Sequence, residues 1–258
     1  EEFDLYNLDK ETFKKFYLYL RKEGLLDKNI PKLLKEETKF HEENISKQLY
    51  KDYSNFKNKY FENIVKNTNI LLLSDEVYEH IIFDGEQHQS AALFPTIAER
   101  TFIVASFGKT FHNTGWKVGY CLAPKELMSE FRKVHQFNVF SVNHPTQVAL
   151  AEYLKTPNNY LELSGFYQQK RDLFLSLLKD SRFEFSPSNG TYFQLLNFKN
   201  ITNESDYEFA IRLTKEKKIA AIPISVFNED ALDTHVLRFC FAKTTETLKA
   251  AAAILCEI

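Results

Sequence analysis

Cysteine, glycine and long apolar runs are scarce in this sequence of 258 residues. The three cysteines, Cys121, Cys240 and Cys256, stand apart among apolar residues, which argues against a disulfide framework and indicates core thiols in a reducing compartment. The longest apolar runs, such as residues 70–73, are too short to cross a bilayer, and the N-terminus shows no signal-peptide pattern. We therefore expect a cytoplasmic protein without a membrane span.

Net charge and metal-binding spacings are lacking too. The sequence holds 33 Lys and Arg against 35 Asp and Glu, a formal net charge of -2, so no overall field points to nucleic acid or a membrane. No spacing of His, Cys and Asp suggests a metal site, and no Ser-His-Asp order suggests a nucleophilic triad. The length is sufficient for one large or two modest domains with an apolar core.

Residues 1–60 hold a single glycine, Gly24, and thus no glycine-rich loop that could cradle a ligand. Apolar side chains recur at helical spacing after Asp9 and again from Ile45, and Pro31 suits the start of another helix. Charged residues fill the remaining faces. We predict a helical segment of unknown role, in which packed helices with solvated outer faces are favoured over a chemical site.

From about residue 70 the pattern changes to short apolar runs that end in polar residues. Residues 70–74 and 101–105 are predicted to be strands covered on both faces. The first strand ends at Asp75, and the second runs on to Ser106 and Lys109. The segment that connects them has the length of a βαβ-like unit. Since open α/β sheets bind ligands at the carboxyl ends of their strands, we expect these polar residues to converge on one site.

The remaining pattern predicts an α/β fold with two parts. We expect strands over residues 118–123, 191–196, 219–224 and 236–242, and helices over residues 124–139, 145–154, 158–179, 206–217 and 245–258. Leu127, Phe131 and Val134 are predicted to face inward from the first of these helices. The order of the elements indicates an incomplete three-layer α/β large domain at residues 61–150 and a smaller α+β domain at residues 151–258.

Lys109 is the first candidate for chemistry, in a turn that Gly108, Gly115 and Gly119 are expected to make possible. A neutral lysine amine can attack a carbonyl and form a Schiff base, as in enzymes that use pyridoxal 5'-phosphate (PLP). Such enzymes pair an acid with the ring nitrogen, and Asp75 is a candidate for that role. The alternative for a lone lysine after a strand is a solvated loop charge.

Hydroxyl and cationic groups around Lys109 could hold the rest of such a cofactor. Ser106 and Lys117 are candidates for the phosphate, and Tyr78 for the phenolic oxygen. Arg238 lies in a predicted strand whose neighbouring side chains are apolar, so its guanidinium needs an anion. A substrate carboxylate and an internal salt bridge are both open from the residues alone. His112, His144, Asn143, Trp116, Tyr120, Phe140 and Tyr192 are weaker candidates, each more often a packing or surface residue.

Several motifs in this order resemble one family. Ser74-Asp-Glu-Val-Tyr78 and Ser106-Phe-Gly-Lys-Thr, followed by Gly115-Trp-Lys-Val-Gly119, closely resemble class I/II, fold-type-I PLP-dependent aminotransferases. The methionine and kynurenine aminotransferase branch is the most similar. The resemblance continues through residues 140–145, 189–193 and 236–241, from about residue 60 to the C-terminus.

The resemblance implies a site and a reaction. Lys109 would carry PLP as a Schiff base and move the proton, Asp75 would hold the ring nitrogen, Tyr78 the phenolic oxygen, Ser106 and Lys117 the phosphate, and Arg238 the substrate α-carboxylate. The implied reaction moves an amino group from a methionine-like, aromatic or kynurenine-like amino acid to a 2-oxo acid, in a homodimer. Lysine at position 117 keeps the charge of the arginine in many relatives but loses its bidentate fork.

The resemblance also implies an absence. The first part of the family's large domain supplies a phosphate-gripping turn and an aromatic ring that stacks on the cofactor, and residues 1–60 contain no counterpart. Two alternatives to an aminotransferase therefore stay open. One is a catalytically silent remnant that acts as a binding or interaction module, and the other is a PLP-dependent C–S lyase on the same scaffold.

Overall fold

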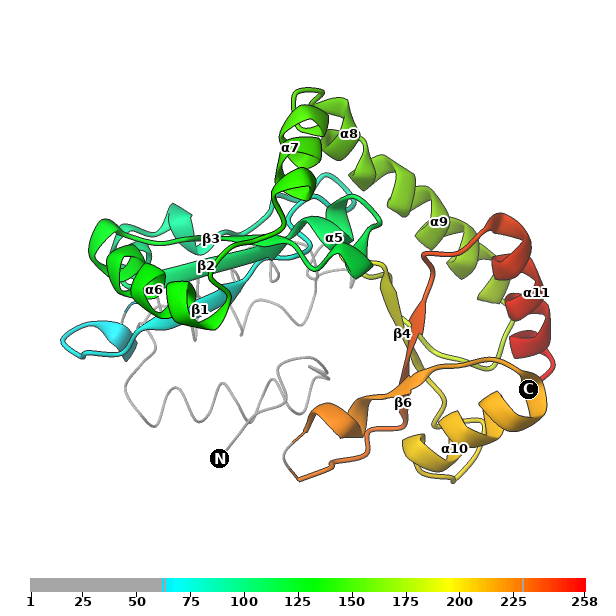
Figure 1. The fold of residues 1–258 in the computed structure, drawn as a ribbon. Coiled ribbons are helices and arrows are strands. Elements are labelled where there is room, and N and C mark those ends of the chain that lie inside the picture. Colours follow the sequence, from blue (N-terminus) through cyan, green and yellow to red (C-terminus); the bar gives the residue numbers. More distant parts are fainter. Residues whose placement is uncertain (1–61, 63, 229) are drawn as a thin grey trace, which may run out of the picture. The chain divides into compact units, whose positions relative to one another are not determined.

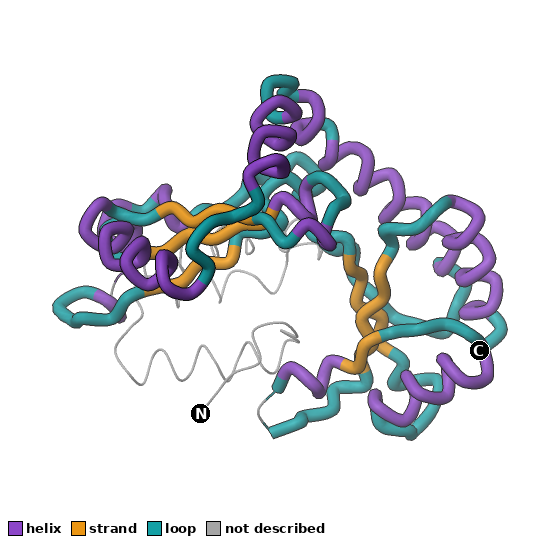
Figure 2. The backbone as a smooth tube through the Cα atoms, in the orientation of Figure 1, coloured by secondary structure: helices purple, strands orange, loops and turns teal. Residues whose placement is uncertain are grey.

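The structure, a computed structural model, describes residue 62, residues 64–228 and residues 230–258 (Figure 1). The helices predicted within residues 1–60 lie outside this part of the chain. Over the described residues, no helix combines the length and the apolar character that a membrane crossing requires. The described strands form two separate three-stranded sheets, visible as two orange groups in Figure 2.

The first sheet has the order β1-β2-β3 and is mixed. β1 (Leu72–Asp75) runs parallel to β2 (Thr101–Ser106), whereas β3 (Gly119–Leu122) runs antiparallel to β2. The connection from β1 to β2 contains η2 (Ala91–Leu93) and α4 (Pro95–Ala98). The parallel pairing confirms the predicted βαβ-like unit, and it places the carboxyl ends of β1 and β2 at the same edge.

Two glycines are needed where the backbone passes close to other segments. A Cβ on Gly119 would lie 2.4 Å from the carbonyl oxygen of Ala105, and a Cβ on Gly108 would lie 2.8 Å from Thr114 Cα. Any larger residue would therefore push β3 away from β2 or open the turn after Lys109. Gly115 has open space where a Cβ would stand, so no close approach requires it.

The predicted burial of residues 70–74 on both faces is wrong. β1 begins only at Leu72, and Leu73 is 73% exposed. Leu73 pairs with Phe102, so the side chains of these two residues lie on the same face of the sheet. Among the described residues this face is only partly covered, so the apolar run predicts that a strand is present but not that it is buried.

The predicted helix over residues 124–139 is observed as α6 (Lys125–Asn138), but the side of it that is predicted to face inward is not buried. No described residue of α6 is buried, and Val134 is 67% exposed. Phe131 contacts Phe102 of β2, with ring centroids 6.2 Å apart. Phe131 thus packs on the sheet and Leu127 is half-buried, whereas Val134 and Phe137 leave part of the apolar side of the helix exposed.

The helices that follow depart from the prediction at one position. α7 (His144–Tyr153) begins where expected, because the Asn143 side chain caps it by accepting a hydrogen bond from the Thr146 amide at 3.0 Å. The single helix predicted over residues 158–179 is instead two helices, α8 (Asn158–Leu161) and α9 (Leu163–Leu178), which are separated at Glu162.

The second sheet has the order β4-β6-β5, with β6 (Val236–Cys240) in the centre and antiparallel to β4 (Phe193–Asn197) and β5 (Ile222–Pro223). The strand predicted over residues 219–224 shrinks to two residues, after which the chain turns into η5 (Ile224–Phe227). Pro223 has no amide hydrogen to donate, so the ladder stops there.

Helices cover one face of the second sheet. α10 (Asp206–Arg212) continues into a π-helical turn, η4 (Leu213–Lys217), and α11 (Thr245–Cys256) lies beside α9 (Figure 1). Along β6, Leu237 and Phe239 are buried on this face, whereas Arg238 between them points to the other face. The strand therefore anchors itself in the core and presents one charged side chain away from it.

The core of this part is rich in phenylalanine. Phe198, Phe209 and Phe241 are fully buried, and the first two rings have centroids 4.6 Å apart. Burial of each such ring stabilises the fold by roughly 1.5–3 kcal/mol. The three cysteines are free thiols, but none is fully buried and Cys256 is exposed, so their assignment as core residues is wrong. The division into domains at residues 150 and 151 remains a prediction.

Candidate active site

Lys109 lies in a short helix and not in the predicted glycine turn. Helix α5 (Phe107–Thr110) follows β2 directly, and Ser106 caps it by accepting a hydrogen bond from the Gly108 amide at 3.1 Å. This cap sets the point at which strand turns into helix. It also places Lys109 in the last turn of α5, half-buried, at the carboxyl end of the sheet.

The other predicted cofactor contacts gather at the same end of the first sheet. Asp75 pairs with Val104 in the parallel register, and Ser106 pairs with Gly119 at the start of β3. Lys117, two residues before β3, is exposed and has a left-handed backbone with φ 56°. The strand register thus brings Asp75, Ser106 and Lys117, from three separate segments, to the same end of the sheet, while their roles toward a cofactor remain predictions.

A group of tyrosines links Lys109 to the second sheet. The Lys109 Nζ lies over the Tyr192 ring, 5.8 Å from its centroid. The rings of Tyr78 and Tyr192 meet edge to face with centroids 5.2 Å apart, and the Tyr78 ring is also 6.2 Å from that of Phe193. Tyr192 therefore touches both the candidate nucleophile and the phenol that the sequence places beside it.

Burial, followed by the hydrogen bond with Tyr192, raises the pKa of the Tyr78 hydroxyl well above its ordinary value. The nearby charge of Arg238 acts in the opposite direction, but it does not outweigh burial. Tyr78 is consequently a neutral phenol at physiological pH, and it is able to donate a hydrogen bond to an anionic oxygen.

Arg238 is the only one of the six candidates that the second sheet supplies. Its guanidinium carbon lies 4.2 Å from the Phe193 ring centroid and 4.7 Å from that of Phe227. Its Nε is buried and has no hydrogen-bond partner, and no carboxylate of the described residues pairs with it. A buried donor without a partner requires an explanation, and a ligand carboxylate would supply one.

The sequence does not predict that Phe193 and Phe227 are neighbours of Arg238. Tyr192 and Phe193 belong to a motif that attracts attention, but only the register of β4 against β6 shows that Phe193 is a diagonal neighbour of Arg238. Phe227, in η5, carries no signal in the sequence. Among the predicted cofactor residues, Asp75 is exposed, and its Oδ1 accepts a hydrogen bond from the Val77 amide at 3.2 Å.

Glu76, next to Asp75, is a buried carboxylate that ties the end of β1 to the following loop. It accepts hydrogen bonds from Ser74 Oγ at 2.9 Å and the Ala91 amide at 2.9 Å, and His88 Nε2 lies 2.8 Å from its second oxygen. Burial on its own would raise the pKa of Glu76, but the hydrogen bonds from His88, Ala91, Ser90 and Ser74 together lower it below its ordinary value. The carboxylate form is thus preferred in the folded chain.

Stability is expected to depend on Glu76 at acid pH. The pKa of Glu76 is lower in the folded chain than in the unfolded chain. The stabilisation that its carboxylate gives the fold is therefore fully present above the unfolded pKa of about 4.3, and it is lost as the pH falls through the folded pKa. Glu76→Gln should lower the free energy of unfolding by about 1–2 kcal/mol at pH 7 and flatten its dependence between about pH 5 and pH 3. Urea unfolding at several pH values measures both effects. A variant with the pH slope of the wild type contradicts this account.

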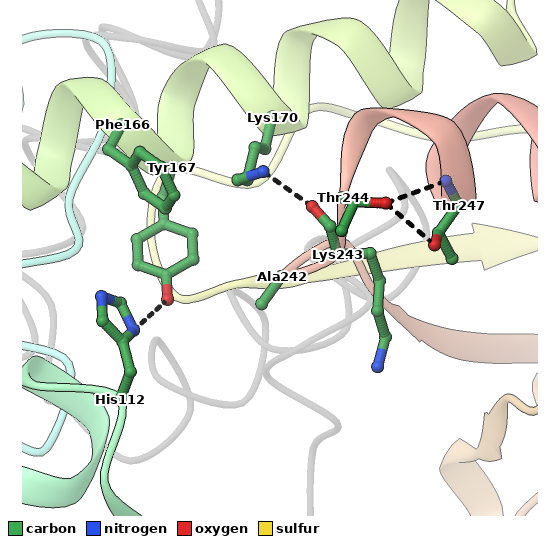
Figure 3. A pocket seen from close by; sticks show the side chains of 8 residues that line it. All are labelled: His112, Phe166, Tyr167, Lys170, Ala242, Lys243, Thr244 and Thr247. Atoms are coloured by element: carbon green, nitrogen blue, oxygen red, sulfur yellow. Dashed lines mark hydrogen bonds between the residues drawn. The ribbon is translucent and has the colours of Figure 1, made fainter.

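A separate pocket of 460 Å³ lies beside the tyrosine group and contains none of the six candidates. Residues from α9 and α11 line it together with His112, as Figure 3 shows. The Tyr167 hydroxyl and His112 Nδ1 share a hydrogen bond of 3.1 Å, and the Tyr167 ring is 5.8 Å from that of Tyr192. Burial, then the charge of Tyr192, raises the pKa of Tyr167 to about 12, so this hydroxyl stays protonated.

Metal ions are not suggested by the described side chains. No group of three or more His, Cys, Asp or Glu residues in this part of the chain is placed to hold one. The chemistry available is instead that of an amine, a neutral phenol, a carboxylate and a guanidinium.

Residues 54–255 match the family described as aminotransferase class I and II. The chain belongs to this family. Among curated proteins, it is 49% identical over 190 residues to methionine aminotransferase of Escherichia coli, covering 73% of this chain and 49% of that protein. It is 35% identical over 207 residues to human kynurenine–oxoglutarate transaminase 3, covering 72% of this chain and 45% of the relative.

Solved structures agree with the family. A crystal structure of the Escherichia coli protein YbdL, with a methionine aminotransferase function, superposes with a TM-score of 0.75 at 46% identity, covering 78% of this chain and 53% of the other. N-succinyldiaminopimelate aminotransferase from Mycobacterium tuberculosis gives 0.71 at 32% identity, covering 76% and 52%. The described part is therefore a portion of the fold-type-I aminotransferase fold, as the sequence predicts.

The chain spans about half the length of the curated relatives that it matches. This agrees with the expectation of an incomplete large domain. The relatives are transaminases, so neither the silent remnant nor the C–S lyase is favoured by these comparisons.

Proposed function

We propose that this chain provides the lysine, the phenol and the carboxylate-binding arginine of a PLP-dependent aminotransferase. The observation that carries the proposal is the continuous contact from Lys109 through Tyr192 and Tyr78 to Phe193 and Arg238. These contacts link a nucleophilic amine, through aromatic rings, to a guanidinium whose buried Nε has no partner among the described residues. A small α-amino acid has an amine and a carboxylate that such a pair can address together.

The donor set fits the chemistry of PLP. A phosphate needs a hydroxyl and a cation. Among the described residues, Ser106 Oγ accepts a hydrogen bond from the Gly108 amide alone, which leaves its own hydrogen able to donate. Lys117 is exposed close by, since Phe107, next to Ser106, donates its amide to the carbonyl of Val118 at 3.2 Å. Asp75 offers a carboxylate to a protonated ring nitrogen. When bound, PLP supplies an electron sink for the substrate α-carbon.

Each residue has a defined task in this proposal. Lys109 Nζ takes the proton from the substrate α-carbon and returns it, because a positioned amine close to that carbon is an effective general base. Tyr78 would donate a hydrogen bond to the phenolic oxygen, and its raised pKa keeps the hydroxyl protonated. Arg238 binds and orients the α-carboxylate through its N–H edge.

The substrates proposed are methionine, aromatic or kynurenine-like amino acids as donors and a 2-oxo acid as acceptor. The names of the relatives support methionine and kynurenine. We also propose a homodimer and a cytoplasmic location. The exposed apolar side chains of α6 support burial against another polypeptide, and three free thiols support a reducing compartment.

The direct test is a PLP titration of the full chain, followed by an assay with L-methionine and 2-oxoglutarate. We expect a visible absorption band on addition of PLP, a shift of that band with L-methionine, and formation of glutamate. Absence of the band, together with absence of a borohydride-trapped adduct on Lys109, overturns the proposal. Release of ammonia and a keto acid without any need for an acceptor would point to the lyase instead.

A further inference from the structure

In the part of the chain that the structure describes, the Arg238 guanidinium contacts aromatic rings and pairs with no acid. Two rings lie close to its carbon, Phe193 at 4.2 Å and Phe227 at 4.7 Å, while its Nε is buried and unpartnered. A guanidinium that stacks on rings uses its flat faces, so its N–H edge stays available in the plane. Such an arrangement suits a group that must accept and release a carboxylate, because no anion from the described residues competes for the edge.

The two rings reach Arg238 from different elements. Phe193 belongs to β4 and is a diagonal neighbour in the sheet, fixed by the pairing of Leu195 with Arg238. Phe227 ends η5, the short turn that follows β5, and is 58% exposed. The first ring is therefore part of the scaffold, whereas the second closes over the guanidinium from the rim of the site.

A buried carboxylate anchors the turn that carries Phe227. Asp206 is 1% exposed, and its two oxygens accept from the Ser225 amide at 2.8 Å and the Ser225 hydroxyl at 2.6 Å. Because Ser225 lies within η5, only two residues before Phe227, the anchor fixes where this ring stands. A ring on a loosely held loop would not keep the guanidinium in one plane.

We propose that Phe227 is a positioning residue, which holds the Arg238 guanidinium so that its N–H edge faces the substrate α-carboxylate. This role rests on the proposed function, since it assigns Arg238 to carboxylate binding. In this role the ring acts through Arg238 and not on the reacting atoms. Loss of the ring should therefore weaken binding of the substrate equally in the ground state and in the transition state.

The test compares Phe227→Leu with Phe227→Tyr in the full chain. Tyr207→Leu is the matched control, because Tyr207 in α10 is also an aromatic residue with 58% exposure. With PLP and 2-oxoglutarate, Phe227→Leu should raise the KM for L-methionine roughly three- to ten-fold with little change in kcat. Phe227→Tyr and Tyr207→Leu should keep the wild-type values. An unchanged KM, or an equal fall in kcat, overturns the proposal.

A second readout does not depend on turnover. In protein labelled with 15N-arginine, the Arg238 Hε resonance, assigned with Arg238→Lys, should be displaced by the rings above it. It should move downfield in Phe227→Leu and stay in place in Phe227→Tyr. An unchanged resonance in Phe227→Leu overturns the proposal whether or not the chain is an aminotransferase.

Titration with L-methionine separates the two ideas. If the wild type forms no glutamate, the proposed function fails, but the Arg238 resonance still reports carboxylate binding. A weaker response to L-methionine in Phe227→Leu than in the wild type then supports the positioning role. Equal responses in both proteins, or no response in the wild type, overturn it.

Discussion

Lys109→Ala is expected to lower the transamination rate at least about 10³-fold and to remove the borohydride-trapped PLP adduct. Loss of a positioned general base alone costs about 10²–10⁴-fold, and the variant also loses the amine that attaches the cofactor. Lys109 stands in the last turn of α5 with its Nζ over the Tyr192 ring. The reaction is followed by glutamate formation, and the adduct by peptide mass.

The neighbouring lysine provides the control for this prediction. Lys117→Ala removes an exposed cation at the same end of the sheet but leaves the attacking amine in place. It should weaken PLP binding roughly ten-fold, on the scale of one charge-assisted hydrogen bond, and retain the adduct at position 109. Lys109→Arg keeps the charge and should still be inactive. A trapped adduct on Lys117 in the wild type contradicts the assignment.

Asp84→Asn is expected to lower the free energy of unfolding by about 1–2 kcal/mol, because it takes the charged partner from the buried Arg171 guanidinium, while solvent around Asp84, which is 36% exposed, reduces the loss. Arg171 of α9 has a side chain only 4% exposed, and its Nη1 and Nη2 donate to Asp84 at 2.6 and 2.8 Å. The hydrogen bond with Asp84 is the main reason that the pKa of Arg171 is raised. Asparagine tolerates the left-handed backbone at position 84, with φ 58°, so the change removes charge more than shape.

The same guanidinium supplies the matched variant. Arg171 also pairs with Asp172 at 2.7 Å, but this carboxylate is 56% exposed. Asp172→Asn should therefore cost less than about 1 kcal/mol. Urea unfolding at neutral pH, followed by far-UV circular dichroism, compares the two. If both variants lose the same stability, the contact between Asp84 and Arg171 is no stronger than a surface pair.

Much of the element order could be predicted because strands and helices leave periodic patterns. β2, α6, α7 and α11 appear close to their predicted bounds, and the parallel pairing of β1 with β2 follows from their spacing. The failures concern position in space. Leu73 and Val134 are as apolar as any core residue, yet both are exposed, because burial depends on which other segments cover a face.

Candidate residues could be named from the sequence where side-chain chemistry is unusual for its surroundings. Lys109 after an apolar strand and Arg238 within one are such cases. Phe193 and Phe227 could not be named in this way, and Tyr192 is only a weaker candidate, because an aromatic residue in an apolar pattern is ordinary. Only the register of β4 against β6, and the turn that ends β5, bring these rings to the lysine and the arginine.

The sequence by itself determined the family, the polar residues at the strand ends and the lack of metal or triad spacings. These depend on residue order, which a sequence contains in full. The tertiary structure alone decided that Arg238 contacts rings and pairs with no acid of the described residues, and that Asp206 fixes the turn carrying Phe227. The physical reason is that such contacts join residues distant in the chain, so that strand register and packing, and not local propensity, select them.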